Sequence, residues 1–348
     1  MKLLVLGTGS MAAAHVSAFK EIEGVEIVAC ADLDHDAAIA FGKEHGIPHH
    51  YAGLDAALSA GGFDAATNVT PDGVHYATTM QLLQERIHVF CEKPLATNFG
   101  HAAAMTDAAN GAGLVNGVNL TYRNVAAIQK AQELVADGAI GEIRHVEASY
   151  LQSWLTQPAW GDWASEPRWL WRLSKDHGSH GALGDVGVHV LDFATFSAGS
   201  PVHAITCQLK TFDKASGNKI GEYTLDANDS FSMTVELENG ATGVVHASRF
   251  ATGHINDLNL KLHGTEGGLH VTNDGALGTL RICNGDDMLT AKWKDVELSE
   301  VKSTYARFAD AVMNGAVMDP DFETAAKLQS VIDSAVISDS SGGKVVID

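Results

Sequence analysis

Three ionisable side chains at helical spacing, Asp185, His189 and Asp192, are the clearest candidates for chemistry in this sequence. Their offsets of four and seven residues would place them on one narrow face of a helix over residues 181–192. Apolar residues on both flanks predict a mostly buried helix, so its polar stripe must meet a partner, a ligand or water. Two internal glycines indicate that the backbone of another segment, or a ligand, comes very close to this helix. The stretch is either a buried Asp–His pair that caps a neighbouring element or part of an active site.

A lysine in the segment Glu92-Lys93-Pro94 is the second candidate, and it directly follows an apolar strand expected over residues 88–91. A charged pair in that place is unusual unless it has a role or a partner. Pro94 restricts Lys93 to extended conformations, and a cis Lys93–Pro94 bond would fix the direction of the amine. The alternative is a surface lysine at a helix start. We favour the functional interpretation.

Aromatic residues gather in a third segment, where five of the six tryptophans lie between residues 154 and 171. Gln, Asp and Arg are interleaved with them. Aromatic faces and polar side chains together suit a sugar, which has apolar C–H faces and a polar rim. A loop that is simply pinned to the surface by its aromatic side chains is the alternative.

The elements that must position these residues begin with a dinucleotide fingerprint at the N-terminus. Residues 3–6 read as a buried parallel strand, and Gly7, Gly9 and Ala12 follow with the spacing G-x-G-x-x-A before a helix over 12–20. Gly7 would permit a tight turn and Gly9 would let backbone approach a pyrophosphate. The N–H groups of the helix start would then face the phosphates.

An acidic residue strengthens this interpretation. A strand expected over residues 25–31 ends at Asp32, close to the usual distance from the glycines. A carboxylate there accepts hydrogen bonds from the adenosine ribose and repels a 2′-phosphate, so NAD is expected rather than NADP. The alternative is that Asp32 only caps the next helix.

Strand and helix patterns alternate through the first third, which predicts an α/β fold with a doubly wound, parallel-sheet Rossmann domain over residues 1–118. Further strands are expected at 65–69, 88–91 and 113–118, and helices at 37–45, 55–59, 74–84 and 102–109. Ligands bind at the carboxyl ends of such strands, so Thr70, Pro71 and the Glu92-Lys93 pair should lie at the cofactor edge.

A different pattern over residues 119–348 predicts a C-terminal α+β domain with a large, open, mainly antiparallel sheet. Its strands are expected at 144–151, 202–210, 231–238, 241–248, 257–263, 269–272 and 344–347, with a two-residue hairpin turn at Asn239-Gly240. Its helices are expected at 125–136, 181–197, 304–313 and 322–337, of which the first two should cover one face of the sheet. The other face could pair subunits, so a homo-oligomer, dimer or tetramer, is expected through this sheet.

Composition narrows the possible partners. The chain has 348 residues, 45% of them hydrophobic, and a net charge of −20, which argues against nucleic acid or an anionic membrane as partner. Its four cysteines form no CxxC pair, which favours a reducing compartment and gives no sign of zinc. No signal segment and no apolar run of ~18 residues is present, so a cytoplasmic location is expected.

The order of these features resembles the glucose-fructose oxidoreductase / inositol dehydrogenase family over essentially the whole chain. The features are the G-x-G-x-x-A start, the Glu-Lys-Pro segment, the Gly-x-x-x-Asp-x-Gly-x-His-x-x-Asp helix and the C-terminal sheet domain. The segment from Tyr150 to Trp154, with Trp171-Arg172, looks most like family members that act on pyranosides and anhydrosugars. The resemblance implies that Lys93, Asp185 and His189 are the catalytic trio.

The implied reaction is NAD-dependent oxidation of a secondary hydroxyl of a carbohydrate or polyol, a small-molecule substrate. His189 would be the base, Asp185 would orient it or bind the substrate, and Lys93 would hydrogen-bond the reacting oxygen. The expected cofactor contacts are Gly7, Thr8, Gly9, Ser10, Met11, Asp32, Asn68, Thr70, Pro71, His75, Glu92, Lys93, Asn119, Trp171 and Arg172. The expected substrate contacts are Lys93, Tyr122, Gln152, Trp154, Asp185, His189 and Tyr305, with Asn119 and Arg172 as further candidates.

Three alternatives stay open at this point. A glycoside-cleaving enzyme could use tightly held NAD for transient oxidation of a sugar carbon, followed by elimination, and would carry the same residues. A metal-dependent hydrolase could use Asp176, His177 and His180 with Asp185 and His189, but the sequence has no H-E-x-x-H helix. A cofactor-binding sensor without turnover is the third, and the intact trio counts against it.

Overall fold

The computed structural model describes residues 1–347, which form two compact units. The first unit joins Met1–Leu120 to Lys302–Gln329, and the second joins Thr121–Val301 to the chain from Ser330 onward. The expected single division between residues 118 and 119 therefore needs a correction, because part of the C-terminal tail packs with the first unit. No helix within residues 1–347 is both long and apolar enough to span a bilayer.

The first unit is built on a six-stranded parallel sheet in the order β3-β2-β1-β4-β5-β6. Its strands are β1 (Lys2–Leu6), β2 (Glu26–Asp32), β3 (His49–Ala52), β4 (Ala65–Asn68), β5 (His88–Cys91) and β6 (Asn116–Val118). The order confirms the doubly wound Rossmann fold, with its reversal point between β1 and β4. Strand β3 was not expected, because a short, half-exposed edge strand has no apolar run to reveal it.

Six helices belong to this unit, together with the one-turn 3-10 helix η1 (Asp72–Val74). They are α1 (Ser10–Lys20), α2 (His35–His45), α3 (Leu54–Ala60), α4 (His75–Gln84), α5 (Phe99–Ala112) and α9 (Thr304–Asn314). Helix α9 comes from the tail and packs against α1, β5 and β6. Its residues Tyr305 and Phe308 join Phe19 and Phe90 in one buried aromatic cluster. Burial of these two rings explains why the tail belongs to the Rossmann unit.

The second unit is built on a nine-stranded sheet in the order β16-β15-β14-β13-β7-β12-β11-β8-β17. Its strands are β7 (Ile143–Leu151), β8 (Val202–Lys210), β11 (Ser230–Leu237), β12 (Thr242–Ser248), β13 (Asp257–Gly264), β14 (Gly267–Thr272), β15 (Thr279–Asn284), β16 (Lys294–Asp295) and β17 (Val345–Val346). All neighbours are antiparallel except β12 and β7, which are parallel. The mainly antiparallel sheet is thus confirmed.

The hairpin between β11 and β12 has a loop of three residues, 238–240, rather than the expected two. The Leu237 N–H donates to the Ala241 carbonyl at 2.8 Å, and the Gly240 N–H donates to the Leu237 carbonyl at 2.9 Å. Gly240 has a φ of 85°, the left-handed conformation that closes such a three-residue loop. The hairpin itself is as expected.

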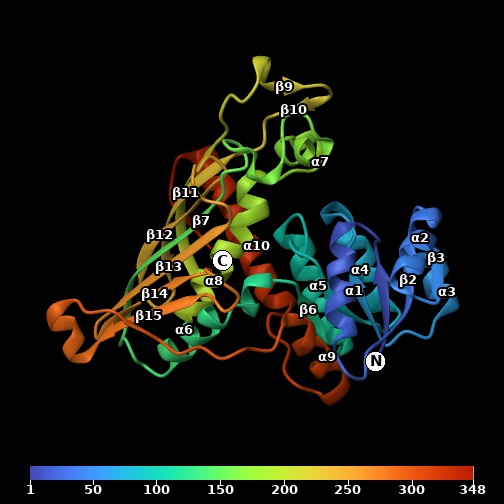
Figure 1. Ribbon diagram of the computed structural model, residues 1–348, viewed down its shortest axis with the longest axis horizontal. Coiled ribbons are helices and arrows are strands. Elements are labelled where there is room, and N and C mark those ends of the chain that lie inside the picture. The colour runs from blue at the N-terminus through green and yellow to red at the C-terminus, as the bar shows by residue number, and fades with distance from the viewer. Residues whose placement is uncertain (348) are drawn as a thin grey trace. The chain divides into compact units, whose positions relative to one another are not determined.

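Helices α6 (Ala126–Ala136) and α8 (Val188–Ala198) cover one face of this sheet, as the sequence predicts (Figure 1). The strands alternate buried and exposed residues, so the opposite face is open. Helix α10 (Phe322–Ser341) starts in the first unit and ends in the second. There the Ser338 and Asp339 side chains accept hydrogen bonds from the β8 backbone.

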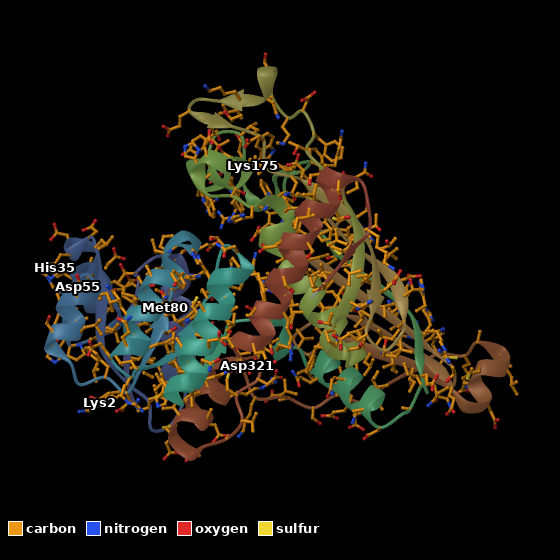
Figure 2. The ribbon with its side chains drawn as sticks, turned by 180° about the vertical axis from the view of Figure 1, so that it is seen from behind. Lys2, His35, Asp55, Met80, Lys175 and Asp321 are labelled. Carbon is orange, nitrogen blue, oxygen red and sulfur yellow. The ribbon has the colours of Figure 1, made fainter. Side chains whose placement is uncertain are left out.

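A small subdomain of the second unit, here called the aromatic lobe, consists of residues 152–180 and 211–229. It holds η3 (Pro158–Trp160), α7 (Pro167–Leu170), η4 (Trp171–Leu173), η5 (Lys175–His177), η7 (Ser216–Asn218) and the hairpin β9 (Lys219–Ile220) and β10 (Tyr223–Thr224). Figure 2 labels Lys175 in this lobe. Its own core gathers Trp154, Leu155, Leu170, Leu173 and Leu225. The tryptophan-rich segment therefore folds around a core of its own. This packing explains part of its aromatic content, because some of its aromatic side chains hold the segment in place.

Candidate active site

The glycine loop after β1 has the geometry that a dinucleotide needs. Gly7 has a φ of 90°, and a Cβ there would lie 2.7 Å from the Val69 carbonyl oxygen. A Cβ on Gly9 would meet nothing within 4 Å. Within the described chain, no side chain caps the start of α1, so its first N–H groups are available to a ligand. A tight turn, open space and orphan N–H groups together fit a pyrophosphate.

Asp32 lies at the end of β2 and is held in its ionised form. Its carboxylate accepts hydrogen bonds from the Thr8 N–H and hydroxyl, at 2.9 and 2.8 Å, and from the Asp34 N–H at 3.0 Å. Burial alone would raise the pKa of Asp32, but these hydrogen bonds outweigh it and hold the pKa below its usual value. The following helix is capped by Asp34, which removes the alternative that Asp32 is only a cap.

Glu92 and Lys93 follow β5, and the Lys93–Pro94 bond is cis, as the sequence hypothesis required. The Glu92 carboxylate contacts His15 Nε2 at 2.8 Å, the Asn119 amide at 2.6 Å and the Lys93 N–H at 3.0 Å. Burial by itself would raise the pKa of Glu92, but His15, with Asn119 and Lys93, lowers the pKa to about 2. A fixed anion therefore supports the backbone of Lys93.

The network behind Glu92 uses buried residues of the same unit. His15 lies in α1, is fully buried, and contacts Thr67 Oγ1 through Nδ1 at 2.7 Å. Asn119 also donates to the Tyr305 hydroxyl at 2.9 Å. Tyr305 was expected to contact substrate, but the structure places its ring in the core of the first unit. That position suits a support for Asn119 and Glu92 better than a substrate contact.

The loop after β4 is tied to the loop after β5. Asn68 accepts a hydrogen bond from the Thr70 hydroxyl at 2.7 Å. The buried His75 places its two ring nitrogens 2.8 and 2.7 Å from the carbonyl oxygens of Pro94 and Thr70. Burial would lower the pKa of His75, but Cys91, Asp72 and the Pro94 carbonyl raise it to about 10. The ring of His75 is fully buried. It would therefore affect a bound cofactor indirectly, by holding these two loops in place.

The helix with the spaced ionisable residues starts with a π-helical turn, Leu183–Gly187, before α8. A π turn closes i→i+5 bonds, so Asp185 is rotated away from the position that an α-helix would give it. A Cβ on Gly184 would lie 2.3 Å from the Cβ of His180. The close approach inferred at this glycine is therefore to the protein's own chain.

The three ionisable residues face three different partners, which corrects the expected single stripe. Asp192 forms a buried, bidentate ion pair with Arg123, with N–O distances of 2.7 to 3.0 Å. Asp185 accepts a hydrogen bond from Arg249 Nη2 at 3.0 Å. His189 packs edge-on against the ring of Tyr122, with centroids 5.0 Å apart. Asp192 thus has the geometry of a structural residue.

Hydroxyl and amide groups surround His189. The hydroxyls of Tyr122 and Tyr150 lie 2.5 Å apart, and both contact the side-chain amide of Asn256, at 2.9 and 2.5 Å. Burial, the Tyr122 hydroxyl and the Asp185 carboxylate raise the pKa of Tyr150 well above its usual range. The Tyr150 phenol is therefore neutral at neutral pH and donates to Asn256 Oδ1.

The same chain of hydrogen bonds reaches the aromatic lobe. Gln152 Nε2 donates to Asn256 Oδ1 at 3.0 Å, and the Trp154 indole donates to Gln152 Oε1 at 3.2 Å. The second unit thus brings together four residues that the sequence singles out: Tyr122, Gln152, Trp154 and His189. Lys93 belongs to the first unit.

Trp171 and Arg172 stay as candidates on the surface of the lobe. The Arg172 guanidinium lies 4.5 Å from the centroid of the Trp171 ring, and Trp171 is exposed. The metal alternative finds no support in their neighbourhood, since His177 contacts Ser174 and its ring centroid lies 4.4 Å from that of Tyr223. Within residues 1–347 no three His, Cys, Asp or Glu side chains are placed to hold a metal ion.

Sequence reasoning missed His15, Asn256 and Arg249. His15 follows Ala12 on the buried side of α1, and a polar residue there is a signal that could have been used. Arg249 continues the alternation of buried residues in β12, at an inward position where a charge needs a partner. Asn256 lies in a loop with no pattern that marks it.

The fold and these residues define the class of protein: an NAD(P)-dependent dehydrogenase, an enzyme that acts on CH–OH groups. A sequence model described as "Oxidoreductase family, NAD-binding Rossmann fold" matches residues 1–120, and one described as "GFO/IDH/MocA C-terminal domain" matches residues 128–270. The chain belongs to this GFO/IDH/MocA oxidoreductase family, as the resemblance implied.

Its relatives include several sugar dehydrogenases. Levoglucosan dehydrogenase of Pseudarthrobacter phenanthrenivorans is 30% identical over 58% of this chain, a match that spans about half (53%) of that relative. D-glucoside 3-dehydrogenase of Escherichia coli is 29% identical over 69% of this chain and 68% of its own length. A levoglucosan dehydrogenase with NADH and levoglucosan has a TM-score of 0.87 at 23% identity, over 100% of this chain and 99% of its own, and it supports the fold alone.

Proposed function

We propose that this protein oxidises a secondary hydroxyl of a sugar, anhydrosugar, glycoside or cyclitol, with NAD as the preferred hydride acceptor. The observation that carries the proposal is the environment of His189: a buried imidazole beside the rings of Tyr122 and Tyr150, whose hydroxyls join the Asn256–Gln152 amide chain. Several donors and acceptors beside one titratable ring suit a polyhydroxyl substrate. The relatives named as sugar dehydrogenases point to the same substrate class.

The proposed roles follow from the chemistry of each side chain. His189 takes the proton of the reacting hydroxyl, and Asp185, one turn earlier, orients the imidazole or a neighbouring hydroxyl. Lys93, whose backbone is held by Glu92, donates a hydrogen bond to the oxygen that develops negative charge. The nicotinamide ring, when bound, accepts the hydride.

The cofactor preference rests on Asp32. A fixed carboxylate with a lowered pKa suits the two hydroxyls of an adenosine ribose and opposes a 2′-phosphate. The glycine loop and the start of α1 would hold the pyrophosphate, and the loops after β4 and β5 would line the nicotinamide side.

The decisive experiment follows absorbance of the reduced cofactor with monosaccharides, inositols, anhydrosugars and glycosides, each with NAD and with NADP. We expect turnover of at least one of them with NAD. Lys93→Ala and His189→Ala should each lose most of kcat, about 100-fold or more, while binding NADH as the wild type does. No reduction with any substrate and either cofactor would contradict the proposal, and near wild-type turnover of either variant would contradict its role.

A second outcome of this experiment would favour glycoside cleavage. Incubation of glycosides without added NAD gives net hydrolysis and no build-up of NADH if the chain uses a tightly held cofactor for transient oxidation. We expect no such hydrolysis, and its appearance would replace oxidation by cleavage as the proposed function.

We also propose a cytoplasmic, homo-oligomeric enzyme. All four cysteines are unpaired and buried, which suits a reducing compartment. The open face of the nine-stranded sheet carries alternating exposed residues from β7, β11, β12 and β13, an arrangement that can pair subunits face to face. Light scattering should give a dimer or a tetramer, and a monomer at micromolar concentration would contradict this part.

A further inference from the structure

A buried arginine, Arg249, contacts one member of the expected catalytic trio and two segments of the aromatic lobe. It directly follows β12, and its side chain is fully buried. Nη2 donates to Asp185 Oδ2 at 3.0 Å, and Nη1 donates to the Arg172 carbonyl at 3.1 Å. Its Cζ lies 5.0 Å from the ring centroid of Trp154. One guanidinium therefore joins the π turn, the η4 segment and the first tryptophan of the lobe.

Burial makes this arginine costly unless it has a function or a complete set of partners. A guanidinium offers five N–H donors, and its Nε here is buried without a hydrogen-bond partner. A buried charge with an unsatisfied donor is a poor way to gain stability, since an apolar residue of similar size usually does as well. The planar fork of arginine, however, can hold a carboxylate and a carbonyl in one fixed geometry.

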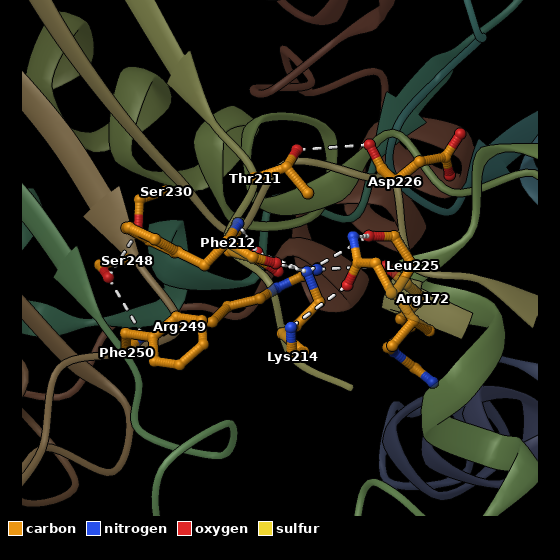
Figure 3. Close-up of polar contacts among 12 residues, drawn as sticks. Arg172, Thr211, Phe212, Lys214, Leu225, Asp226, Ser230, Ser248, Arg249 and Phe250 are labelled. Carbon is orange, nitrogen blue, oxygen red and sulfur yellow. Dashed lines mark hydrogen bonds and ion pairs between the residues drawn. The ribbon is translucent and has the colours of Figure 1, made fainter. Parts of the chain in front are cut away.

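A second ion pair anchors the segment on which Arg249 rests. Lys214 and Asp229 are both fully buried, and Lys214 Nζ lies 2.6 Å from Asp229 Oδ2 (Figure 3). The Asp229 carboxylate also accepts from the Phe212 N–H at 2.8 Å, and the Asp229 carbonyl accepts from the Arg249 N–H at 2.9 Å. The backbone that carries Arg249 is thus fixed from the side of the lobe.

The charge of Arg249 also bears on His189. Asp185 precedes His189 by one turn, and the same carboxylate acts on the neighbouring Tyr150. An uncompensated anion beside an imidazole favours the imidazolium, which cannot accept a proton. A cation on Asp185 reduces that influence, so the imidazole stays neutral at lower pH.

We propose that Arg249 is a positioning residue: it fixes the orientation of Asp185, offsets its charge so that His189 remains a neutral base, and ties Asp185 to the aromatic lobe. This inference rests on the proposed function, because it assigns Arg249 to the same reaction. The described contacts of Asp185 and His189 include Arg249, Tyr122 and Tyr150, and the Lys214–Asp229 pair anchors the backbone of Arg249.

The test compares three variants. Arg249→Gln removes the charge, Arg249→Lys keeps the charge and loses the fork, and Lys214→Met breaks the other buried ion pair of the same region without touching Asp185. We expect Arg249→Gln to lower kcat about tenfold or more and to move the acid limb of kcat/KM upward by about one pH unit. Arg249→Lys should lower kcat and leave the limb in place. Lys214→Met should lower Tm and leave the limb in place.

A double variant and a measurement without turnover complete the test. Adding Asp185→Asn to Arg249→Gln removes the carboxylate whose charge Arg249 offsets, so the acid limb should return to its wild-type position. The titration midpoint of the His189 imidazole, followed by NMR and assigned by its loss in His189→Asn, should move in the same direction as the limb. NADH should still bind to all variants, because the residues expected to bind the cofactor phosphates and ribose lie in the first unit.

The outcomes separate the two proposals. Suppose that the wild type is active but Arg249→Gln moves neither the acid limb of kcat/KM nor the titration midpoint of His189. That result would overturn the positioning role and leave the dehydrogenase function intact. An equal shift in Lys214→Met would mean that a loosened lobe, rather than Arg249 itself, causes the effect, and would also overturn it. A wild type inactive on every sugar contradicts the function, and the NMR midpoint still decides the role of Arg249. If Arg249→Gln fails to fold, Arg249→Lys decides through its loss of kcat at unchanged Tm.

Discussion

At the scale of single residues, the structure separates groups that the sequence presents alike. Asp185, His189 and Asp192 all lie at helical spacing in the chain. In the structure, however, Asp185 meets a buried arginine, His189 meets two phenols and Asp192 forms a structural ion pair. Asp32 and Asp34 are also alike in sequence, yet only Asp34 caps α2. The partner of each carboxylate, rather than its position in a motif, decides its role.

Asp32→Ala tests the cofactor preference at this scale. Loss of a charge-assisted hydrogen bond to the ribose should raise the KM for NAD about 10- to 100-fold. Loss of the negative charge should weaken the NADP reaction far less, so the preference for NAD shrinks. Steady-state kinetics with both cofactors measures this. Asp34→Ala is the matched control, which should cost about 1 kcal/mol of stability through the lost cap and leave both KM values unchanged. An unaltered NAD-to-NADP ratio in Asp32→Ala would refute the assignment.

Glu92→Gln tests the buried network beside Lys93 through its pH dependence. The pKa of Glu92 is lowered from 4.5 to about 2, so its carboxylate stabilises the fold fully above about pH 4.5 and loses this effect as the pH falls toward 2. Glu92→Gln should therefore be less stable than the wild type by about 2–3 kcal/mol at pH 7. The difference should narrow as the pH falls from 4.5 toward 2.

Urea unfolding at a series of pH values measures that difference. Glu133→Gln is a suitable control, because Glu133 forms an exposed pair with Lys130 and should change stability by less than about 0.5 kcal/mol at any pH. A stability gap for Glu92→Gln that is constant from pH 7 to pH 3 would show that Glu92 is not held as a buried anion.

At the scale of elements, the π turn at Leu183–Gly187 is the feature that most affects the site. It rotates Asp185 relative to His189 and places the Asp185 carboxylate within reach of Arg249. π turns inside α-helices occur frequently at functional sites. The sequence pattern of this stretch fits an ordinary α-helix equally well, because periodicity alone does not distinguish one inserted residue.

Gly184→Ala tests the packing of this turn. The new Cβ would lie 2.3 Å from the Cβ of His180, so the turn must shift, at a cost of about 1–3 kcal/mol. Because Asp185 is the next residue, kcat should fall more than the stability change alone explains. Gly187→Ala in the same helix is the control, since its Cβ would be 3.3 Å from a Leu183 methyl group and should have a smaller effect on both. Gly187 belongs to the same π turn, so equal losses of kcat in the two variants would argue against a special role of the Gly184–His180 contact.

At the scale of the whole molecule, the chain builds its two units from interrupted segments. The Rossmann unit needs residues 302–329 to complete its aromatic core, and the sheet unit needs the end of α10 to cover β8. A chain cut at a single boundary therefore leaves each unit incomplete. Folding of the cofactor-binding unit depends on the last fifth of the sequence.

Phe308→Ala tests this dependence. The Phe308 ring is fully buried between Phe19 and Phe90, so its loss should cost the first unit about 3–5 kcal/mol. We expect a lower Tm and, near that Tm, loss of NADH binding, measured by cofactor fluorescence. Val317→Ala lies in the same tail segment with an exposed side chain and should change neither. A wild-type Tm for Phe308→Ala would mean that the tail is dispensable for the Rossmann core.

The sequence by itself determined the features that depend on neighbouring residues. The glycine loop, the strand that ends at Asp32, the Glu92-Lys93-Pro94 segment after a buried strand and the alternating strands of the second sheet all follow from local spacing and burial pattern. The tertiary structure alone decided the partners: Arg249 for Asp185 across 64 residues, Arg123 for Asp192 across 69, and Tyr305 for Asn119 across 186. Local patterns report which face of an element is buried, whereas the side chain that neutralises a buried charge is chosen by packing between distant segments.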